Sequence, residues 1–182
     1  TGIFQFVMEA NHKAVSEWRS EMSSWLVGRF KTVESVHEDL EITMQYGKLR
    51  NSLCFQGKFR HSDLQVEVSL DAGCRYLNYK VTCDWHEIGN EETGVPRLQF
   101  CMPLPYQNQA YLQDIPFGLM ERKEMGTDTP ALSFTAAFDE QGKRGIALSS
   151  KNTYGYRCED NTIALALLRS PYDPDLYPEN GI

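Results

Sequence analysis

The sequence lacks several features that would assign it to a large functional class. Its longest apolar run, Ile163–Leu168, is far shorter than the roughly 20 residues that span a bilayer as a helix. Basic residues are fewer than acidic ones, 18 against 25, so the formal net charge is −7. Because an acidic chain repels phosphate backbones and anionic headgroups, we expect neither nucleic acid nor a membrane as a partner. The first residues also lack the basic and apolar regions of a signal peptide.

Paired cysteines and familiar catalytic motifs are missing as well. The cysteines are odd in number and contain no Cys-x-x-Cys pair: Cys54, Cys74, Cys83, Cys101 and Cys158. We expect buried free thiols in a reducing compartment, and a disulfide framework or a zinc site is the alternative. No Gly-rich phosphate loop and no Gly-x-Ser-x-Gly elbow is present. The four histidines do not stand at metal-ligand spacing, so the chain is not expected to hold a metal or another cofactor.

Short segments with period-two alternation dominate what is present. Such alternation is typical of half-buried strands, and turn residues separate the segments at intervals of about ten residues. The alternating segments are Ile42–Tyr46, Leu64–Leu70, Arg97–Leu104 and Ala131–Phe138. Tyr76–Cys83 is rich in β-branched and aromatic residues, and Thr162–Leu168 is an apolar run of strand length. They predict an all-β fold, a large antiparallel β-sandwich of roughly ten strands in a single domain over residues 1–182. One short helix is predicted over Lys13–Trp25, with the start of a strand at Trp25 as the alternative.

A first polar cluster consists of Asp84, Trp85, His86 and Glu87. On a strand, Asp84 and His86 would point to one face, and Trp85 and Glu87 to the other. A shared metal or an acid/base pair is the functional interpretation of the first two. We favour a structural one, in which the carboxylate of Asp84 orients the imidazole and Trp85 packs beneath the sheet.

A second polar cluster follows the apolar run near the end of the chain. Its members are Arg169, Tyr172, Asp173 and Asp175, and two prolines stiffen the backbone between them. Sugars are recognised by planar polar groups and aromatic faces, which this loop offers. We predict that these four residues line a substrate cleft, and the alternative is a solvated terminal loop.

Four segments, in this order and spacing, resemble one known family, the α-mannosidases of glycoside hydrolase family 38. The family patterns are V-D-W-H-E, I-P-F-G-x-x-E-R-P, G-V-A-L-L-N-D-x-K-Y-G-Y and L-S-L-L-R-x-P-x-x-P-D. The corresponding segments here are Val81–Glu87, Ile115–Arg122, Gly145–Tyr156 and Leu165–Asp175. Lys123 stands where the family has proline, and Lys123–Thr129 is predicted to form a shortened, divergent loop.

The resemblance implies a fold and a function beyond what the residues themselves indicate. Members are zinc-dependent retaining α-mannosidases whose zinc ligands and nucleophile belong to an N-terminal α/β catalytic domain. The resembling part is the C-terminal β-sandwich, which is supersandwich-like and galactose-mutarotase-like. We therefore expect a fragment of a longer chain that is inactive alone. Its expected partners are the missing catalytic domain and a mannose-containing oligosaccharide. A homo-oligomer is left open, and the reduced cysteines suit a cytoplasmic location.

Two other functions are compatible with the sequence. A free-standing carbohydrate-binding module would expose a row of aromatic side chains, for which Tyr154, Tyr156 and Tyr172 are the candidates. A purely structural scaffold would instead expose a contiguous apolar patch of several hundred Å².

Overall fold

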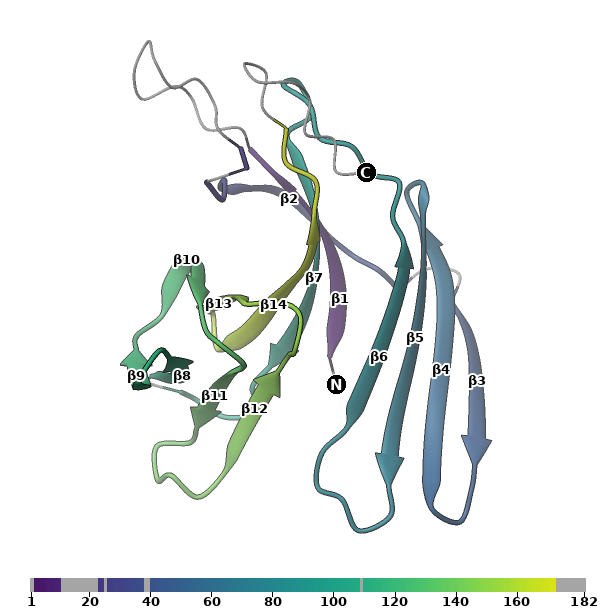
Figure 1. Ribbon diagram of the computed structural model, residues 1–182, viewed down its shortest axis with the longest axis vertical. Coiled ribbons are helices and arrows are strands. Elements are labelled where there is room, and N and C mark those ends of the chain that lie inside the picture. Colours follow the sequence, from purple (N-terminus) through teal and green to yellow (C-terminus); the bar gives the residue numbers. More distant parts are fainter. Residues whose placement is uncertain (1, 11–22, 25, 38–39, 109, 173–182) are drawn as a thin grey trace. The chain divides into compact units, whose positions relative to one another are not determined.

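Strands make up all the regular structure of this chain that the computed structural model describes, namely residues 2–10, 23–24, 26–37, 40–108 and 110–172. These ranges contain fourteen strands and no helix, which confirms the all-β prediction (Figure 1). The helix predicted over Lys13–Trp25 lies largely outside the described residues. Within the same ranges, no helix is long and apolar enough to cross a membrane.

The chain divides into two compact units. Unit one comprises Thr1–Ser35 and Ile88–Ile182, and unit two comprises Val36–Glu87. Unit two is therefore an insertion in the sequence of unit one. The single domain expected over residues 1–182 remains a prediction.

Unit two is one antiparallel sheet in which each strand pairs with the next along the chain (Figure 1). Its strands are, in order across the sheet, β3 (Glu41–Tyr46), β4 (Arg50–Phe59), β5 (Ser62–Asp71) and β6 (Asn78–Asp84). The alternation found in the sequence places apolar residues on one face, where Leu53 stands opposite Val68 and Val66 opposite Val81. Leu64 and Val66 are buried, so the apolar face is centred on β5.

The larger sheet of unit one has six antiparallel strands. In order across the sheet they are β10 (Met125–Pro130), β13 (Gly155–Glu159), β14 (Thr162–Arg169), β7 (Val95–Pro103), β1 (Ile3–Glu9) and β2 (Phe30–Ser35). The prediction of a loop over Lys123–Thr129 is wrong for most of its length, because Met125–Thr129 belongs to strand β10. Met125 and Thr129 pair with β13, and an irregularity lies between them, because the polar, turn-like composition here is overridden by pairing with a neighbouring strand.

The smaller sheet of unit one completes a sandwich-like arrangement. Its strands are, in order, β12 (Gly145–Ser149), β11 (Phe134–Phe138), β8 (Tyr111–Ile115) and β9 (Gly118–Arg122). Tyr111 and Ala137 from this sheet belong to the same buried core as Tyr156 and Ile163 from the larger sheet. All four are fully buried, so this core packs the two sheets against each other.

The other face of the larger sheet is polar. Strand β7 alternates between apolar and polar residues, and Arg97 and Gln99 lie on the polar face. A bulge in β14, between Ala166 and Leu168, shifts the register so that Arg169 stands opposite Arg97. This face positions the site described below.

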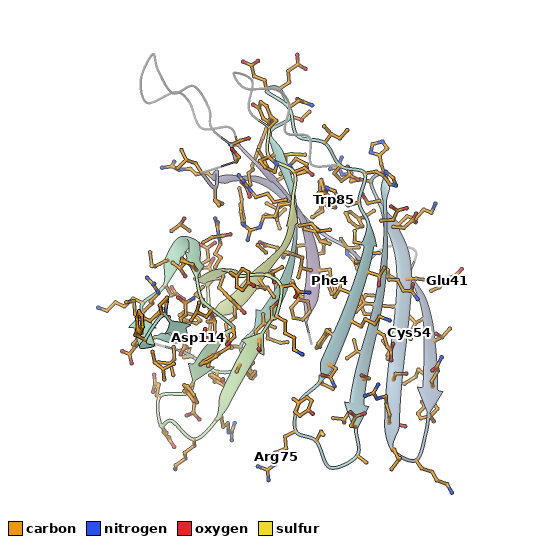
Figure 2. All side chains as sticks on the ribbon, viewed as in Figure 1. Phe4, Glu41, Cys54, Arg75, Trp85 and Asp114 are labelled. Carbon is orange, nitrogen blue, oxygen red and sulfur yellow. The ribbon has the colours of Figure 1, made fainter. Side chains whose placement is uncertain are left out.

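Asp114 joins β8 to the beginning of β11, and Figure 2 labels it in the smaller sheet. Its carboxylate accepts hydrogen bonds from the backbone N–H groups of Ser133 (2.9 Å) and Phe134 (3.0 Å), and from the Ser133 hydroxyl. Desolvation alone would raise the pKa of Asp114, but these hydrogen bonds outweigh it and hold the pKa below its ordinary value of 3.8.

This lowered pKa predicts an acid-dependent loss of stability. The carboxylate contributes fully above its unfolded-state pKa, and the contribution is lost as the pH falls through the lower folded-state pKa. The variant Asp114→Asn is therefore expected to weaken the fall in urea midpoint on acidification below pH 3.8. Ser133→Ala, which removes one donor, is expected to do so in part. A wild-type acid dependence in Asp114→Asn would contradict this assignment.

Candidate functional site

Arg169, the last residue of β14, forms a buried ion pair with Glu9, the last residue of β1. Its Nε lies 3.1 Å from both carboxylate oxygens of Glu9, and its Nη2 lies 2.8 Å from Oε2. The Glu9 carboxylate also accepts a hydrogen bond from the backbone N–H of Gly28 (3.0 Å). Glu9 is fully buried, and the Arg169 side chain is 17% exposed. The pair therefore fixes the end of β14 against the end of β1.

Arg169 also holds the segment that precedes β2. Its Nη1 donates to the carbonyl of Ser23 (2.6 Å), and its Nη2 donates to the carbonyl of Leu26 (2.7 Å). The Ser23 hydroxyl accepts a hydrogen bond from the backbone N–H of Tyr172 (2.6 Å) and donates to the Tyr172 carbonyl. All three nitrogens of the guanidinium are therefore engaged, and residues far apart in sequence are held at one end of unit one.

A second part of the same polar face joins Arg97, Asp128 and Arg157. Arg97 Nη1 lies 2.5 Å from one oxygen of Asp128, and Arg157 Nε lies 3.1 Å from the other. Arg97 Nη1 is also 3.6 Å from Glu9, which connects this group to Arg169. We call Glu9, Arg97, Asp128, Arg157 and Arg169 the arginine network.

Phe30 of β2 lies against two of these guanidinium groups. The Cζ of Arg157 is 3.7 Å from the ring centroid, and the Cζ of Arg97 is 5.3 Å from it. Arginine stacks well on aromatic faces, so the ring covers charge that the carboxylates do not reach. Arg97 is fully buried, and among the described residues its Nε and Nη2 have no hydrogen-bond partner. The carboxylates of Glu9 and Asp128 therefore provide the essential compensation for the buried positive charge of Arg97.

The four residues predicted to line a cleft are placed differently from one another. Arg169 is mostly enclosed by its own contacts, and Tyr172 is 6% exposed. Asp173 and Asp175 lie outside the described residues. The structure thus brings Arg169 and Tyr172 together through Ser23, and their role toward a substrate stays a prediction.

The polar cluster of unit two lies at the end of β6, where Figure 2 labels Trp85. His86 Nε2 is 3.2 Å from an oxygen of Asp84, and both side chains are exposed. The Trp85 ring lies 6.1 Å from that of Phe59. Glu87 accepts hydrogen bonds from the backbone of His61 (2.8 Å) and from the Ser62 hydroxyl (2.7 Å), while that hydroxyl accepts one from the His86 backbone (2.9 Å). Glu87 therefore ties the β4–β5 turn to the end of β6.

The described residues offer no metal centre, and three of their thiols are held in the protonated form. They contain no group of three or more His, Cys, Asp or Glu side chains that could hold a metal ion, so the zinc implied by the resemblance has no fitting ligand set among them. All five cysteines are free, but only Cys101 and Cys158 are buried as expected, whereas Cys54, Cys74 and Cys83 are partly exposed. Desolvation raises the pKa of Cys83 and Cys101 to about 11 and that of Cys158 to about 12, so these thiols stay protonated near neutral pH.

Sequence reasoning missed most of the arginine network. Glu9, Asp128 and Arg157 lie in segments where one or two charged residues on a strand suggest solvated side chains. Arg97 gave the clearest signal, because it stands in phase with the polar face of an otherwise apolar segment. The network combines five different strands, and no spacing along the chain announces that meeting.

Comparison with known proteins relates the chain to a family and to a mouse protein. Residues 7–177 match the family described as the glycosyl hydrolases family 38 C-terminal domain. The chain is also 28% identical, over 145 residues, to Alpha-mannosidase 2C1 of Mus musculus. That alignment covers 74% of this chain and 13% of the mouse protein, so the chain spans a small part of the length of this relative.

Proposed function

The chain belongs to the glycosyl hydrolase family 38 C-terminal domains, and from this premise we propose that it is the non-catalytic C-terminal domain of an α-mannosidase. In this proposal it supports, and partly lines, the cleft in which the full-length enzyme hydrolyses terminal α-mannosides of an oligosaccharide. The zinc and the nucleophile would come from the catalytic domain of the same polypeptide. The reduced, unpaired cysteines favour the cytoplasm as its location.

The observation that carries the proposal is the complete engagement of Arg169. Its guanidinium is used on Glu9 and on two backbone carbonyls, and this use fixes the segment around Ser23 relative to Tyr172. Such contacts suit a residue that positions neighbouring loops. Retaining hydrolysis needs two carboxyl groups about 5–5.5 Å apart that are free to act on substrate. The carboxylates of Glu9 and Asp128 are instead occupied by arginines, which favours a supporting role.

A free-standing carbohydrate-binding module receives less support. Tyr156 is fully buried and Tyr172 is 6% exposed, whereas Tyr154 is 54% exposed. These three tyrosines therefore do not form the exposed row of aromatic rings that this alternative requires.

The proposal is tested by comparing the full-length protein with this chain alone on an aryl α-mannoside. Turnover is expected from the full-length protein and none from the isolated chain. In the full-length protein, Arg169→Lys is expected to lower kcat by about 10- to 100-fold with a smaller change in KM, because the loops that Arg169 holds shift while the sugar-binding groups remain.

The matched control is Arg50→Lys, which weakens the exposed ion pair with Asp71 in unit two and is expected to keep wild-type kcat. Turnover by the isolated chain, or its absence in the full-length protein, would overturn the proposed function. A folded Arg169→Lys variant with unchanged kcat would remove Arg169 from the positioning role.

A further inference from the structure

The hairpin between β8 and β9 has an unusual residue at its tip. Ile115 pairs with Gly118, which leaves Pro116 and Phe117 as the two central residues of the turn. Phe117 has a φ of 71°. Proline followed by a residue of positive φ is the pattern of a type II turn, in which glycine or asparagine normally takes the second central position. A phenylalanine in this position has a strained backbone conformation.

The side chain of Phe117 is also completely exposed, with a relative accessibility of 109%. Leu119, two residues along β9, is 61% exposed, and Leu132 is 51% exposed. Leu132 lies beside the hairpin, because its backbone N–H donates to the carbonyl of Asp114 (3.0 Å). We call Phe117, Leu119 and Leu132 the hairpin patch.

The other non-glycine residues with positive φ differ from Phe117. Among the described residues they are Arg60, Asp160 and Asn161, all polar. The side chain of Asn161 is engaged in hydrogen bonds, because its amide nitrogen donates to the carbonyls of Leu104 and Tyr106. The short polar side chains of Asp160 and Asn161 tolerate the left-handed region, whereas Arg60 has a longer, charged side chain. Phe117 has neither this tolerance nor any burial that would offset its strain, so its presence is unexplained by the folding of unit one.

We propose that Phe117 is an anchor that inserts into an apolar pocket on the part of the α-mannosidase polypeptide that lies outside this chain. This inference rests on the proposed function. Backbone strain clusters at functional sites, and exposed apolar patches mark interaction sites. The alignment covers only 13% of the mouse relative, so that protein extends far beyond the matched region. Most of such a polypeptide is therefore available as the other side of the contact.

The size of the hairpin patch favours a partner within the same polypeptide. A separate protein needs about 1,600 Å² of buried surface for a specific, stable complex, which three side chains do not approach. A contact between parts of one chain needs far less, because covalent connection supplies a high effective concentration. A second copy of this chain is therefore the less suitable occupant.

The direct test places 4-fluorophenylalanine at position 117 and measures the exposure of the fluorine to solvent by NMR. In the isolated chain the fluorine is expected to be exposed, and in the full-length protein it is expected to be buried. 3-Fluorotyrosine at position 156, which is fully buried, provides the reference for burial in both samples. Equal exposure of the label at position 117 in both proteins would overturn the anchor.

The outcomes also separate this inference from the function on which it rests. Exposed fluorine in a full-length protein that hydrolyses mannosides removes the anchor and keeps the function. Burial of the label in the isolated chain that increases with protein concentration would assign the hairpin patch to a second copy and would also overturn the anchor.

Two substitutions test the same inference without a label. Phe117→Gly and Phe117→Asn relieve the backbone strain, so the Tm of the isolated chain is expected to stay equal or rise. The full-length protein is expected to lose its activity several-fold faster at elevated temperature, since the anchor is gone. Leu49→Asn removes another highly exposed apolar side chain, in unit two, and is expected to leave that rate unchanged. Equal inactivation rates for the Phe117 variants and the wild type would contradict the anchor.

Discussion

Replacing Glu9 by glutamine is expected to lower the free energy of unfolding of unit one by about 3–5 kcal/mol, the usual cost of removing one partner from a buried ion pair. Glutamine keeps the shape of the side chain but leaves Arg169 without its carboxylate and Arg97 with less compensation. Glu9 is fully buried, so water cannot take the place of its carboxylate beside the two arginines. Hydrogen exchange in denaturant, followed at the amides of β1 and β7, measures the effect and separates it from unit two.

The exposed pair between Arg50 and Asp71 provides the matched control. It has the same chemistry, with Arg50 Nε at 2.5 Å and Nη2 at 3.0 Å from the carboxylate, but its side chains are 55% and 31% exposed. The variant Asp71→Asn is expected to change the stability of unit two little, because solvent screens the pair. Equal losses from Glu9→Gln and Asp71→Asn would contradict the importance of burial.

Replacing Gly94 by alanine is expected to cost unit one about 3 kcal/mol or more. Gly94 has a φ of 103°, and an added Cβ would lie 2.1 Å from the carbonyl oxygen of Glu9. Backbone strain and the clash each contribute about 1–3 kcal/mol. The clash is with backbone, so relief requires β7 to move away from β1 at the residue that carries the buried carboxylate. The change is measured as the shift in urea midpoint.

Gly142 allows strain to be separated from the clash. It also has a positive φ, 66°, but an added Cβ would meet nothing within 4 Å. Gly142→Ala is therefore expected to cost only the strain of a left-handed residue, about 1–2 kcal/mol. If Gly94→Ala proves no more damaging than Gly142→Ala, the close approach of Gly94 to Glu9 does not limit the packing of these strands.

Strand positions were the most predictable part of this protein. The segments Leu64–Leu70 and Arg97–Leu104 fall on β5 and β7, and the apolar run Thr162–Leu168 falls on β14, because alternation and short apolar runs are local properties of strands. Their pairing was not predictable in the same way. Strand β1 pairs with β7, whose residues follow about ninety positions later, as Phe6 opposite Leu98 illustrates. Nothing local records a register of that kind.

The candidate site was predictable only in part for the same reason. Arg169 was chosen from its loop, but its contacts come from Glu9 and Ser23, which are 160 and 146 positions away. The strand β10 was missed because its composition is that of a loop, and Asp128 on it is placed by Arg97 and Arg157. The sequence shows that such a side chain is charged. It does not show which distant residues will surround that side chain in the folded protein.

The insertion of unit two into unit one has a consequence for biosynthesis. Unit two consists of consecutive strands joined by short turns, so its pairings form as soon as its own residues have left the ribosome. In unit one, β1 cannot pair with β7 until β7 has been synthesised, and the Glu9 carboxylate lacks Arg169 until the end of β14 has been synthesised. We therefore expect the inserted unit to fold first, and we expect the interval before β14 is synthesised to be the period of greatest exposure to misfolding.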